Sequence, residues 1–503
     1  MDKKKSVLNV TVSIVSKLVI MVVCIWVKRS LIMFCGNDVN GLNSLYLSII
    51  GFLAVAELGV GSAISFCMYR PIVEGDNHKV SALYQLFRKW YLCVGAVILG
   101  CGLALTPFVH LFAKDYAQLN VDIYTPFVLM LVSVAVTYLF GAKTALIDAY
   151  KNNYITTAIN SGGMLLQYVL QILVLYVTGS FSAYLVCRIM AALAQWCITE
   201  WITRKKYTGI ISVSATIDVE TKQELSQKIR AMFMHNIGLL LVNTVDSVVI
   251  SIFIGVATLG AYSNYAAIQT SMDSLLRLVF TSLTAIIGHM YVEKTRETAQ
   301  RYHEAFHLLN FVLGTLFYLG YYAVIDDLVA IIFNEKFVMA RSVSMMITMN
   351  GFVQFLRRGT LTFRDATGTF YNDRWKPLLE GIVNCILSVV LVQRIGIEGV
   401  VIATIATNLL ICHVVEPYVL YKNAFQESPG RYYLRNYGMI LIFWCALRLF
   451  QVIEVSDYGH WCDFLINGTV SVVISVVVCS VTLLLNRDVR NLLRRRMKHG
   501  TVG

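Results

Sequence analysis

The sequence VLNVTVSIVSKLVIMVVCIWVKRSLIMF (residues 7–34) decides the fold together with NSLYLSIIGFLAVAELGVGSAISFCM (residues 43–68). These two stretches are joined by the short turn Gly36-Asn37-Asp38-Val39-Asn40-Gly41. Each is longer than the ~20 residues that an α-helix needs to cross the hydrocarbon core of a bilayer. We therefore expect an antiparallel pair of transmembrane helices near the start of the sequence.

Each of these two predicted helices carries one charge deep in its apolar run. Lys17 lies in the first helix and Glu57 in the second. At a rise of about 1.5 Å per residue, both lie roughly 15–16 Å from the same membrane face. A charge at that depth costs at least ~2.5 kcal/mol, so it normally faces a partner or a wet cavity. The pattern predicts a Lys17–Glu57 ion pair at a polar site inside a membrane helix bundle.

The composition agrees with a polytopic membrane protein. The chain has 503 residues, of which 57% are hydrophobic and 14% charged, and its mean hydropathy is +0.65. An ordinary soluble domain has about 25% charged residues. The first apolar run is too long for the core of a cleavable signal peptide, so we expect the first helix to be retained. The twelve cysteines lie mostly inside apolar spans, which favours small core residues over disulfides or metal ligands.

Fourteen apolar spans are predicted along the chain. They are residues 7–34, 43–68, 86–112, 122–147, 153–178, 181–203, 230–256, 260–288, 304–333, 342–366, 376–395, 398–421, 433–453 and 462–485. An even number of spans places both termini on one side of the membrane. Segments on that side carry 32 of the 42 Lys and Arg residues, and segments on the other side carry seven. Because basic loops stay in the cytoplasm, both termini are predicted to be cytoplasmic.

This charge distribution also limits the partners. The net charge of +12 follows the membrane topology, so we interpret it as a signal for orientation and lipid headgroups and not for nucleic acid. The predicted external loops are short, about four to ten residues, which leaves no room for an extramembrane domain.

The sequence contains a repeat with an offset of 219 residues. It relates Phe34, Gly36, Gly41, Ser44 and Tyr46 to Phe253, Gly255, Gly260, Ser263 and Tyr265. With six spans in each half, the repeat predicts two pseudo-symmetric six-helix lobes, an arrangement frequent in transporters. The predicted divisions are an N-terminal lobe at residues 1–203 and a cytoplasmic linker at 204–229, with an interfacial helix at 220–228. They continue with a C-terminal lobe at residues 230–421 and two further helices with a basic cytoplasmic tail at 422–503.

Eleven charged residues within the spans are the candidate site residues. Seven are cations and four are anions: Lys17, Lys28, Arg29, Arg188, Arg277, Arg357 and Arg358, against Glu57, Asp246, Asp273 and Glu380. A cavity lined by this set would be net positive and would suit an anionic substrate. We assign substrate binding to Lys17, Lys28, Arg29, Arg188 and Arg277, and an ion-pairing, coupling or gating role to Glu57, Asp246 and Asp273.

The repeat adds a hypothesis about gating. With the 219-residue offset, Lys28 corresponds to position 247, next to Asp246. Lys28, Arg29 and Asp246 are therefore expected at similar depth near the outer face, in opposite lobes. Rocking of the lobes about a midplane site would bring these charges together when the outer side closes.

Structural alternatives remain open for several of these residues. Arg357, Arg358 and Glu380 lie close enough to span ends to reach the headgroups, and Asp273 and Arg277 have the spacing of a purely intrahelical pair. Lys28 and Arg29 have the position of interfacial anchors. Histidines 78, 289, 303, 307, 413 and 499 are predicted in or beside loops, without metal-ligand spacing. No nucleophile motif, triad order or phosphate-binding loop is present, so we expect no enzyme activity and no cofactor.

Two groups of motifs carry a family resemblance. The first is Glu57-Leu58-Gly59-Val60-Gly61, followed by Phe66 and Tyr69-Arg70-Pro71. The second is Pro377-Leu378-Leu379-Glu380-Gly381-Ile382-Val383-Asn384, continuing through Gly396-Ile397-Glu398-Gly399 to Glu416-Pro417-Tyr418. In their order along essentially the whole chain, they resemble the Wzx-type polysaccharide flippases, a polysaccharide transporter family of the multidrug/oligosaccharidyl-lipid/polysaccharide exporter superfamily.

The resemblance implies a V-shaped pair of lobes around a cationic cavity in the bacterial cytoplasmic (inner) membrane. It also implies translocation of undecaprenyl-pyrophosphate-linked oligosaccharide for capsule, exopolysaccharide or O-antigen biosynthesis. The expected partners are this substrate, membrane lipids, and the polysaccharide polymerase and chain-length machinery. From the family we carry over the cationic cavity alone, onto Lys17, Lys28, Arg29 and Arg277.

Three other functions are possible for such a chain. A cation-coupled drug antiporter of the same superfamily would need an acidic cavity, which the excess of cations disfavours. A sugar polymerase or ligase would need a sizeable external loop, which the short loops disfavour. A peptidoglycan-precursor (lipid II) flippase would have the same fold and a cationic cavity, so it remains an alternative.

Overall fold

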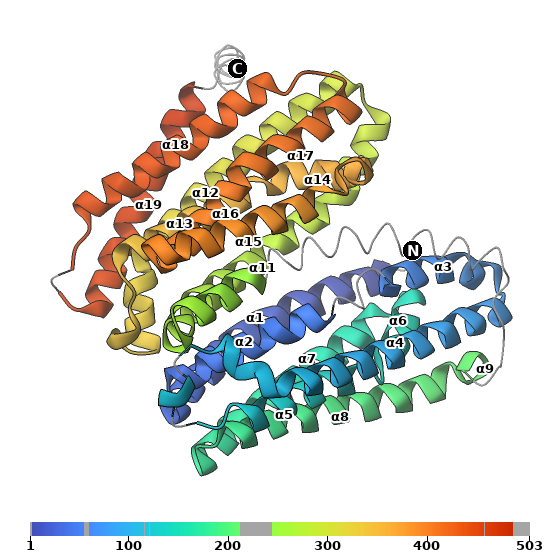
Figure 1. Cartoon of the computed structure of the whole chain (residues 1–503). Coiled ribbons are helices and arrows are strands. Elements are labelled where there is room, and N and C mark those ends of the chain that lie inside the picture. Colours follow the sequence, from blue (N-terminus) through green and yellow to red (C-terminus); the bar gives the residue numbers. More distant parts are fainter. Residues whose placement is uncertain are drawn as a thin grey trace. The chain divides into compact units, whose positions relative to one another are not determined.

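A computed structural model describes residues 3–54, 60–114, 116–119, 121–211, 244–456 and 458–485. The described residues form helices joined by short turns, and they contain no β-strand. The predicted all-α fold class is therefore confirmed (Figure 1). The masked part of the chain includes Glu57 and the predicted interfacial helix at residues 220–228, so both lie outside the described residues.

The chain divides into two compact units. Unit 1 comprises Met1–Leu278 and Arg374–Val400, and unit 2 comprises Val279–Asp373 and Val401–Gly503. Two helices, α11 and α16, thus contribute residues to both units. The lobe and linker boundaries predicted from the sequence stay a prediction.

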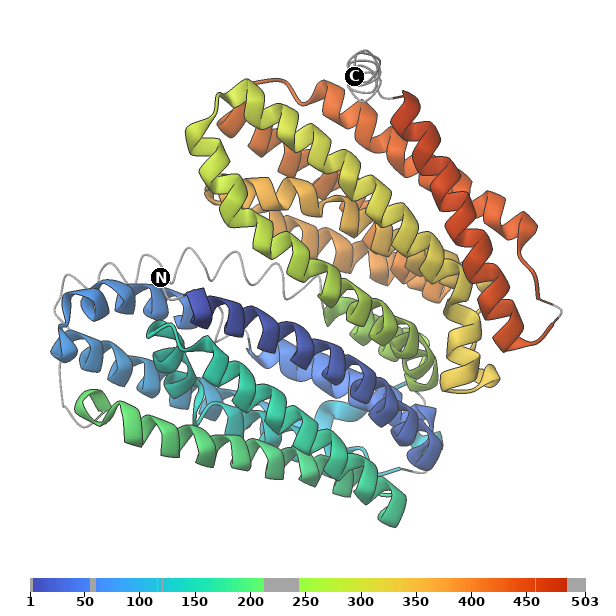
Figure 2. The same ribbon diagram turned by 180° about the vertical axis from the view of Figure 1, so that it is seen from behind.

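Unit 1 contains the whole described N-terminal half and parts of the second half (Figure 2). Its helices are α1 (Lys3–Cys35), α2 (Asn37–Leu53), α3 (Val60–Glu74), α4 (Asn77–Leu105), α5 (Tyr124–Thr137), α6 (Gly141–Ala149), α7 (Asn153–Thr178), α8 (Phe181–Lys206), α9 (Thr208–Ile211), a helix at Thr244–Phe253, the first part of α11 (Val256–Glu293) and α15 (Lys376–Ile395). Short 3-10 helices follow α4 at Thr106–Phe112 and Tyr116–Gln118.

Unit 2 is built around one long helix, α12 (Arg296–Ile332), which packs against α13 (Arg341–Leu356) and α19 (His460–Leu485). The remaining elements of this unit are the second part of α11, α14 (Arg358–Ala366), most of α16 (Ile397–Thr407), α17 (His413–Leu420) and α18 (Gly430–Ile453). Short π-helical turns lie on both sides of α17, at Asn408–Cys412 and Tyr421–Phe425, and 3-10 turns lie at Glu335–Phe337 and Thr369–Asp373.

Ten described helices are long and apolar enough to cross a membrane. The protein is therefore a multi-pass membrane protein. Several predicted spans are two helices in the structure: residues 122–147 divide into α5 and α6, and residues 342–366 into α13 and α14. The predicted total of fourteen spans remains a prediction, because part of the chain lies outside the described residues.

The core of unit 1 contains residues from both halves of the sequence. Tyr46 on α2 is fully buried against Phe127, and its hydroxyl donates a hydrogen bond to the carbonyl oxygen of Ile123 at 2.7 Å. Val249 and Leu259, more than 200 residues farther along the chain, belong to the same apolar cluster. Burial of large side chains contributes about 1.5–3 kcal/mol each, so this cluster fixes the start of the second repeat within unit 1.

The turns that join the first two helices of each repeat share an unusual backbone. Gly36 precedes α2 with a φ of 91°, and Gly255 precedes α11 with a φ of 139°. Other residues rarely adopt these values, because a Cβ atom would crowd the backbone. The 219-residue offset therefore relates two equivalent chain reversals.

Helices α2 and α11 cross at two further glycines of the repeat. A Cβ atom on Gly41 would lie 2.0 Å from the carbonyl oxygen of Val256, and one on Gly260 would lie 2.3 Å from that of Asn37. The offset maps Gly41 onto Gly260 and Asn37 onto Val256, so the two close contacts are equivalent. Here the sequence repeat corresponds to a local pseudo-two-fold relation between α2 and α11.

Candidate functional site

Lys28 lies where α1 approaches α11. Its Nζ atom donates hydrogen bonds to the carbonyl oxygen and to Oγ of Ser263, both at 2.8 Å. The side chain is half-buried. An ammonium group has three donors, so one N–H remains for another acceptor.

Asparagines from the first turn of α2 complete this polar junction. The Asn40 side-chain amide donates to the carbonyl oxygen of Gly260 at 2.9 Å and lies 3.1 Å from both Ser263 Oγ and Asn264 Oδ1. The Asn37 amide donates to the carbonyl oxygen of Ala257 at 2.8 Å. We call Lys28, Asn37, Asn40, Ser263 and Asn264 the α1–α2–α11 junction. It connects helices of the two sequence repeats by hydrogen bonds that depend on the close glycine crossing.

Arg188 is the second half-buried cation of unit 1. It lies on α8, with the phenol groups of Tyr168 and Tyr184 as its electrostatic neighbours. Cys24 on α1 is close to both tyrosines and to Lys28. Among the described residues, neither Lys28 nor Arg188 forms an ion pair with a carboxylate. Lys28 on α1 and Arg188 on α8 are thus two cations of unit 1 without a carboxylate counter-ion among the described residues, and we regard them as a candidate anion site.

The other three cations assigned to substrate binding are exposed. Lys17 lies on α1 and Arg277 on α11, and both side chains are exposed. Arg29 is also exposed and stacks over the ring of Trp26 at 5.6 Å, the contact expected of an interfacial anchor. Glu57 lies outside the described residues, so the predicted Lys17–Glu57 ion pair stays a prediction.

Two of the predicted acidic residues, Asp246 and Asp273, lie on the first two helices of the second repeat. Asp246 is half-buried on helix Thr244–Phe253, close to Tyr262. Asp273 is half-buried on α11, one turn before Arg277. Lys28 makes its hydrogen bonds with Ser263, and an outer gate that joins Lys28 or Arg29 to Asp246 remains a prediction.

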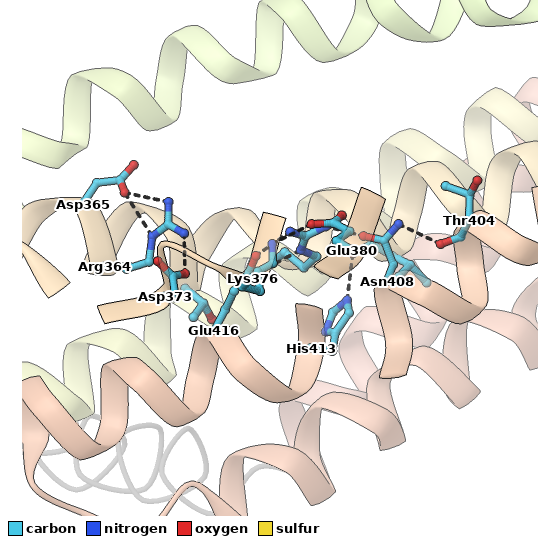
Figure 3. A network of polar contacts seen from close by, with 12 residues as sticks. Arg364, Asp365, Asp373, Lys376, Glu380, Thr404, Asn408, His413 and Glu416 are labelled. Carbon is cyan, nitrogen blue, oxygen red and sulfur yellow. Dashed lines mark hydrogen bonds and ion pairs between the residues drawn. The ribbon is translucent and has the colours of Figure 1, made fainter. Parts of the chain in front are cut away.

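An ion pair that sequence reasoning did not identify lies in unit 2, and Figure 3 labels its acidic member, Glu416. Arg357 binds both carboxylate oxygens of Glu416, with Nε–Oε2 at 3.1 Å and Nη2–Oε1 at 2.5 Å. It also donates to Asn408 Oδ1, and the Asn408 amide donates to the carbonyl oxygen of Thr404 at 2.9 Å. The Glu416 side chain is 1% exposed. The feature of the sequence that could have indicated this ion pair is the carboxylate of Glu416 within an apolar span.

Two more ion pairs join charged side chains that are almost completely buried. Arg364 and Asp373 lie 2.7 Å apart in unit 2, and Lys376 and Glu380 lie 2.8 Å apart in unit 1 (Figure 3). The side chains of Lys376 and Glu380 are both 4% exposed. Glu380 and Arg357 therefore bind protein partners, and the alternative in which they reach headgroups is wrong for both.

Three histidines predicted in or beside loops lie inside helices instead. His303 and His307 on α12 are 0% exposed, and His413 at the start of α17 is 1% exposed. For His303 and His307 the prediction was wrong because the apolar pattern begins at residue 304, whereas α12 begins two turns earlier, at Arg296. Helix ends that extend beyond the apolar run leave little trace in hydrophobicity.

Comparison with known proteins identifies the fold. No protein-family model matches the chain, and no curated protein matches its sequence. Among solved structures, the lipid II flippase MurJ in an inward closed conformation is 11% identical, with a TM-score of 0.65 over 95% of this chain and 99% of that chain.

Two multidrug transporters give similar matches. An inward-facing multidrug resistance MATE family transporter of the MOP superfamily is 11% identical, with a TM-score of 0.61 over 86% of this chain and 98% of its own. A point mutant of the MATE transporter VcmN of Vibrio cholerae is 14% identical, with a TM-score of 0.54 over 85% of this chain and 100% of its own. At these identities the likeness concerns the fold alone. The chain therefore has the fold of MOP-superfamily transporters and flippases.

Proposed function

We propose that this protein is a flippase that translocates undecaprenyl-pyrophosphate-linked oligosaccharide repeat units across the cytoplasmic membrane by alternating access. The repeat units would serve capsule, exopolysaccharide or O-antigen biosynthesis. The observation that supports this most is the pair of half-buried cations, Lys28 and Arg188, without a carboxylate partner among the described residues.

The chemistry of this cation pair suits a lipid diphosphate. A pyrophosphate carries at least two negative charges and cannot cross hydrocarbon unaccompanied. Lys and Arg bind such oxygens through short, charge-assisted hydrogen bonds, and the Tyr168 and Tyr184 hydroxyls beside Arg188 are suitable donors to sugar or phosphate oxygens. The lipid tail would remain in the bilayer while the polar headgroup passes the cations.

A lipid II flippase is the second candidate, and one observation favours it. The match to MurJ covers 95% of this chain, more than either multidrug transporter covers. Lipid II and a lipid-linked repeat unit would present the same diphosphate to Lys28 and Arg188. A cation-coupled drug antiporter fits less well, because a cationic drug would be repelled by these two residues.

Transport by the reconstituted protein tests the proposal. Proteoliposomes that contain a fluorescent undecaprenyl-pyrophosphate oligosaccharide should show flipping that competes with unlabelled lipid diphosphate. Complementation of two strains, one lacking an oligosaccharide flippase and one depleted of its lipid II flippase, separates the two candidates. No flipping of either lipid, by a protein that is folded and correctly inserted, would reject both.

The remaining predicted cations are tested in the same assay. Lys17→Ala and Arg277→Ala should each abolish complementation while the protein still inserts, because each lost charge-assisted hydrogen bond contributes about 1.5–3 kcal/mol. Arg448→Ala is the matched control, since Arg448 is paired with Gln451 and Trp444 at the end of α18. Normal export by both variants would remove Lys17 and Arg277 from the site. Under this proposal the polymerase and chain-length machinery are expected partners.

A further inference from the structure

The interior of unit 2 contains a cluster of three histidines. His303 and His307 lie on one face of α12 with their rings stacked at a centroid distance of 6.4 Å. The ring of Tyr432 lies 4.7 Å from that of His307, and His413 is an electrostatic neighbour of His307. All three histidines are at most 1% exposed. We call His303, His307 and His413 the histidine cluster.

Two of these imidazoles have hydrogen bonds that a neutral ring satisfies. His413 Nε2 lies 3.0 Å from the carbonyl oxygen of Val353, which can only accept, and the Asn436 amide donates to Nδ1 at 2.9 Å. These two contacts match the neutral tautomer with its proton on Nε2. An imidazolium would place two N–H donors against each other at Asn436.

His303 is part of a chain of hydroxyl groups. Its Nε2 lies 3.3 Å from Thr360 Oγ1 and its Nδ1 lies 3.4 Å from the Tyr421 hydroxyl. Thr360 Oγ1 in turn lies 2.9 Å from the Tyr432 hydroxyl. Each hydroxyl can donate or accept, so this chain can reorganise around a proton without moving a heavy atom far.

His307 differs from the other two. Neither of its ring nitrogens has a hydrogen-bond partner among the described residues, and the same holds for both amide atoms of Asn310 one turn later. Both residues are 0% exposed, and a Cβ atom on Gly359 would lie 2.9 Å from Asn310 Nδ2. Buried polar atoms are nearly always paired, so these four atoms mark a place where water or a proton can bind.

The charged groups around the cluster cancel one another. Glu304 on α12 is paired with Arg435 on α18 at 3.1 Å, and Glu416 on α17 is paired with Arg357. The phenols that contact the cluster are Tyr421 and Tyr432, and Tyr433 and Tyr437 are electrostatic neighbours of Tyr432. Among the described residues, no carboxylate forms an ion pair with any of the three imidazoles. A buried imidazolium would therefore lack a counter-ion, which is costly.

We propose that the histidine cluster is a proton-binding site that couples protonation to the conformation of unit 2. The described conformation holds all three imidazoles neutral and buried. A proton taken up at His307 favours a second conformation, in which water enters between α12, α17 and α18. This coupling of protonation to conformation does not depend on the proposed function. Only the additional inference that proton uptake drives transport rests on it.

Hydrogen–deuterium exchange of the full chain in lipid nanodiscs tests this site without a transport assay. One linked proton changes a conformational equilibrium up to tenfold per pH unit. Between pH 7.5 and 5.5, amides of α12 around His303 to Thr315 and of α17 should exchange about tenfold faster or more, after correction for the chemical effect of pH. The triple variant H303Q/H307Q/H413Q should lose this effect, and His110→Gln, at a half-buried histidine of unit 1, should keep it.

Two outcomes would overturn the proposal. One is equal protection of α12 in the wild-type protein at both pH values, and the other is a pH effect that persists in the triple variant. If the triple variant does not fold, selective ¹⁵N-histidine NMR of the wild-type protein decides. At pH 7.5, three imidazoles should be neutral and inaccessible to exchange. A buried imidazolium at that pH, or no change in the three buried signals down to pH 5.5, would reject the site.

Discussion

At the scale of single residues, the Arg357–Glu416 pair shows how an intramembrane charge is retained. Its two hydrogen bonds and the additional contact to Asn408 compensate for removal of both groups from water. A buried pair contributes little net stability by itself, but loss of one partner leaves an uncompensated charge. We therefore infer that this pair determines how the α13–α14 junction packs against α17 and contributes little net stability.

The first prediction concerns this pair. Arg357→Ala should destabilise the protein by about 3–5 kcal/mol, because Glu416 is left buried without a partner. Thermal unfolding in detergent measures the loss. Arg301→Ala is the control, since the Arg301–Glu297 pair has side chains 78% and 75% exposed. Equal effects of the two substitutions would show that burial of Glu416 does not govern stability here.

The second prediction concerns the anion site. Arg188→Ala should reduce flipping roughly ten- to hundredfold, as expected for loss of one charge-assisted hydrogen bond, while Arg188→Lys should retain part of the activity. A purely structural role predicts a different result, in which both variants lose thermal stability together with activity. Activity of Arg188→Ala equal to that of wild type would exclude Arg188 from substrate binding.

At the scale of elements, the glycine crossing of α2 and α11 sets the spacing on which the α1–α2–α11 junction depends. Lys28 reaches Ser263, and Asn40 reaches Gly260, because Gly41 and Gly260 allow backbone contact. The sequence revealed the repeated glycines but not the partners of Lys28 and Asn40. Hydrophobic periodicity identifies a helix and its apolar face, whereas the crossing of two helices depends on side-chain packing.

The same limit explains the residues that sequence reasoning missed. Glu416 and its partner Arg357 are 59 residues apart, and no local pattern connects them. His303 and His307 were predicted in or beside a loop because α12 extends beyond its apolar run. In contrast, the repeat located both chain reversals, at Gly36 and Gly255, where positive φ favours glycine. The predicted turn was too long, because Asn37–Gly41 belong to α2.

The third prediction tests the crossing. Gly41→Ala and Gly260→Ala should each impair folding or export, because the new methyl group would overlap backbone atoms of Val256 or Asn37. Gly162→Ala is the matched control within α7, where no atom lies within 4 Å of the added methyl group, and it should be neutral or stabilise by up to ~1 kcal/mol. Full export by Gly41→Ala would show that α2 and α11 separate without cost.

At the scale of the whole molecule, the distribution of basic residues predicts the orientation in the membrane. The fourth prediction is that a membrane-impermeant thiol reagent labels Lys336→Cys from outside and Lys205→Cys only after permeabilisation, in a background without native cysteines. Both positions are exposed, whereas Asn37 is buried in the α1–α2–α11 junction and is unsuitable for labelling. Reversed labelling would place both termini outside.

The last prediction concerns the outer gate and depends on the repeat. Arg29 is exposed and, by the 219-residue offset, lies near the depth of Asp246 in the other repeat. Asp246→Lys should impair export by placing like charges together, and the added substitution Arg29→Asp should partly restore it. Lys28 is unsuited to the reversal because its ammonium group binds Ser263.

The size of the expected rescue follows from the pair energy. A surface-like ion pair contributes ~0.2–1 kcal/mol and a desolvated one more, and about 1.4 kcal/mol changes the ratio of two conformations tenfold. Rescue by several-fold would therefore indicate a partly desolvated pair that stabilises the outward-closed state. If Arg29→Asp restores nothing, Arg29 is an interfacial anchor held by Trp26, and the proposed ion pair with Asp246 does not form the outer gate.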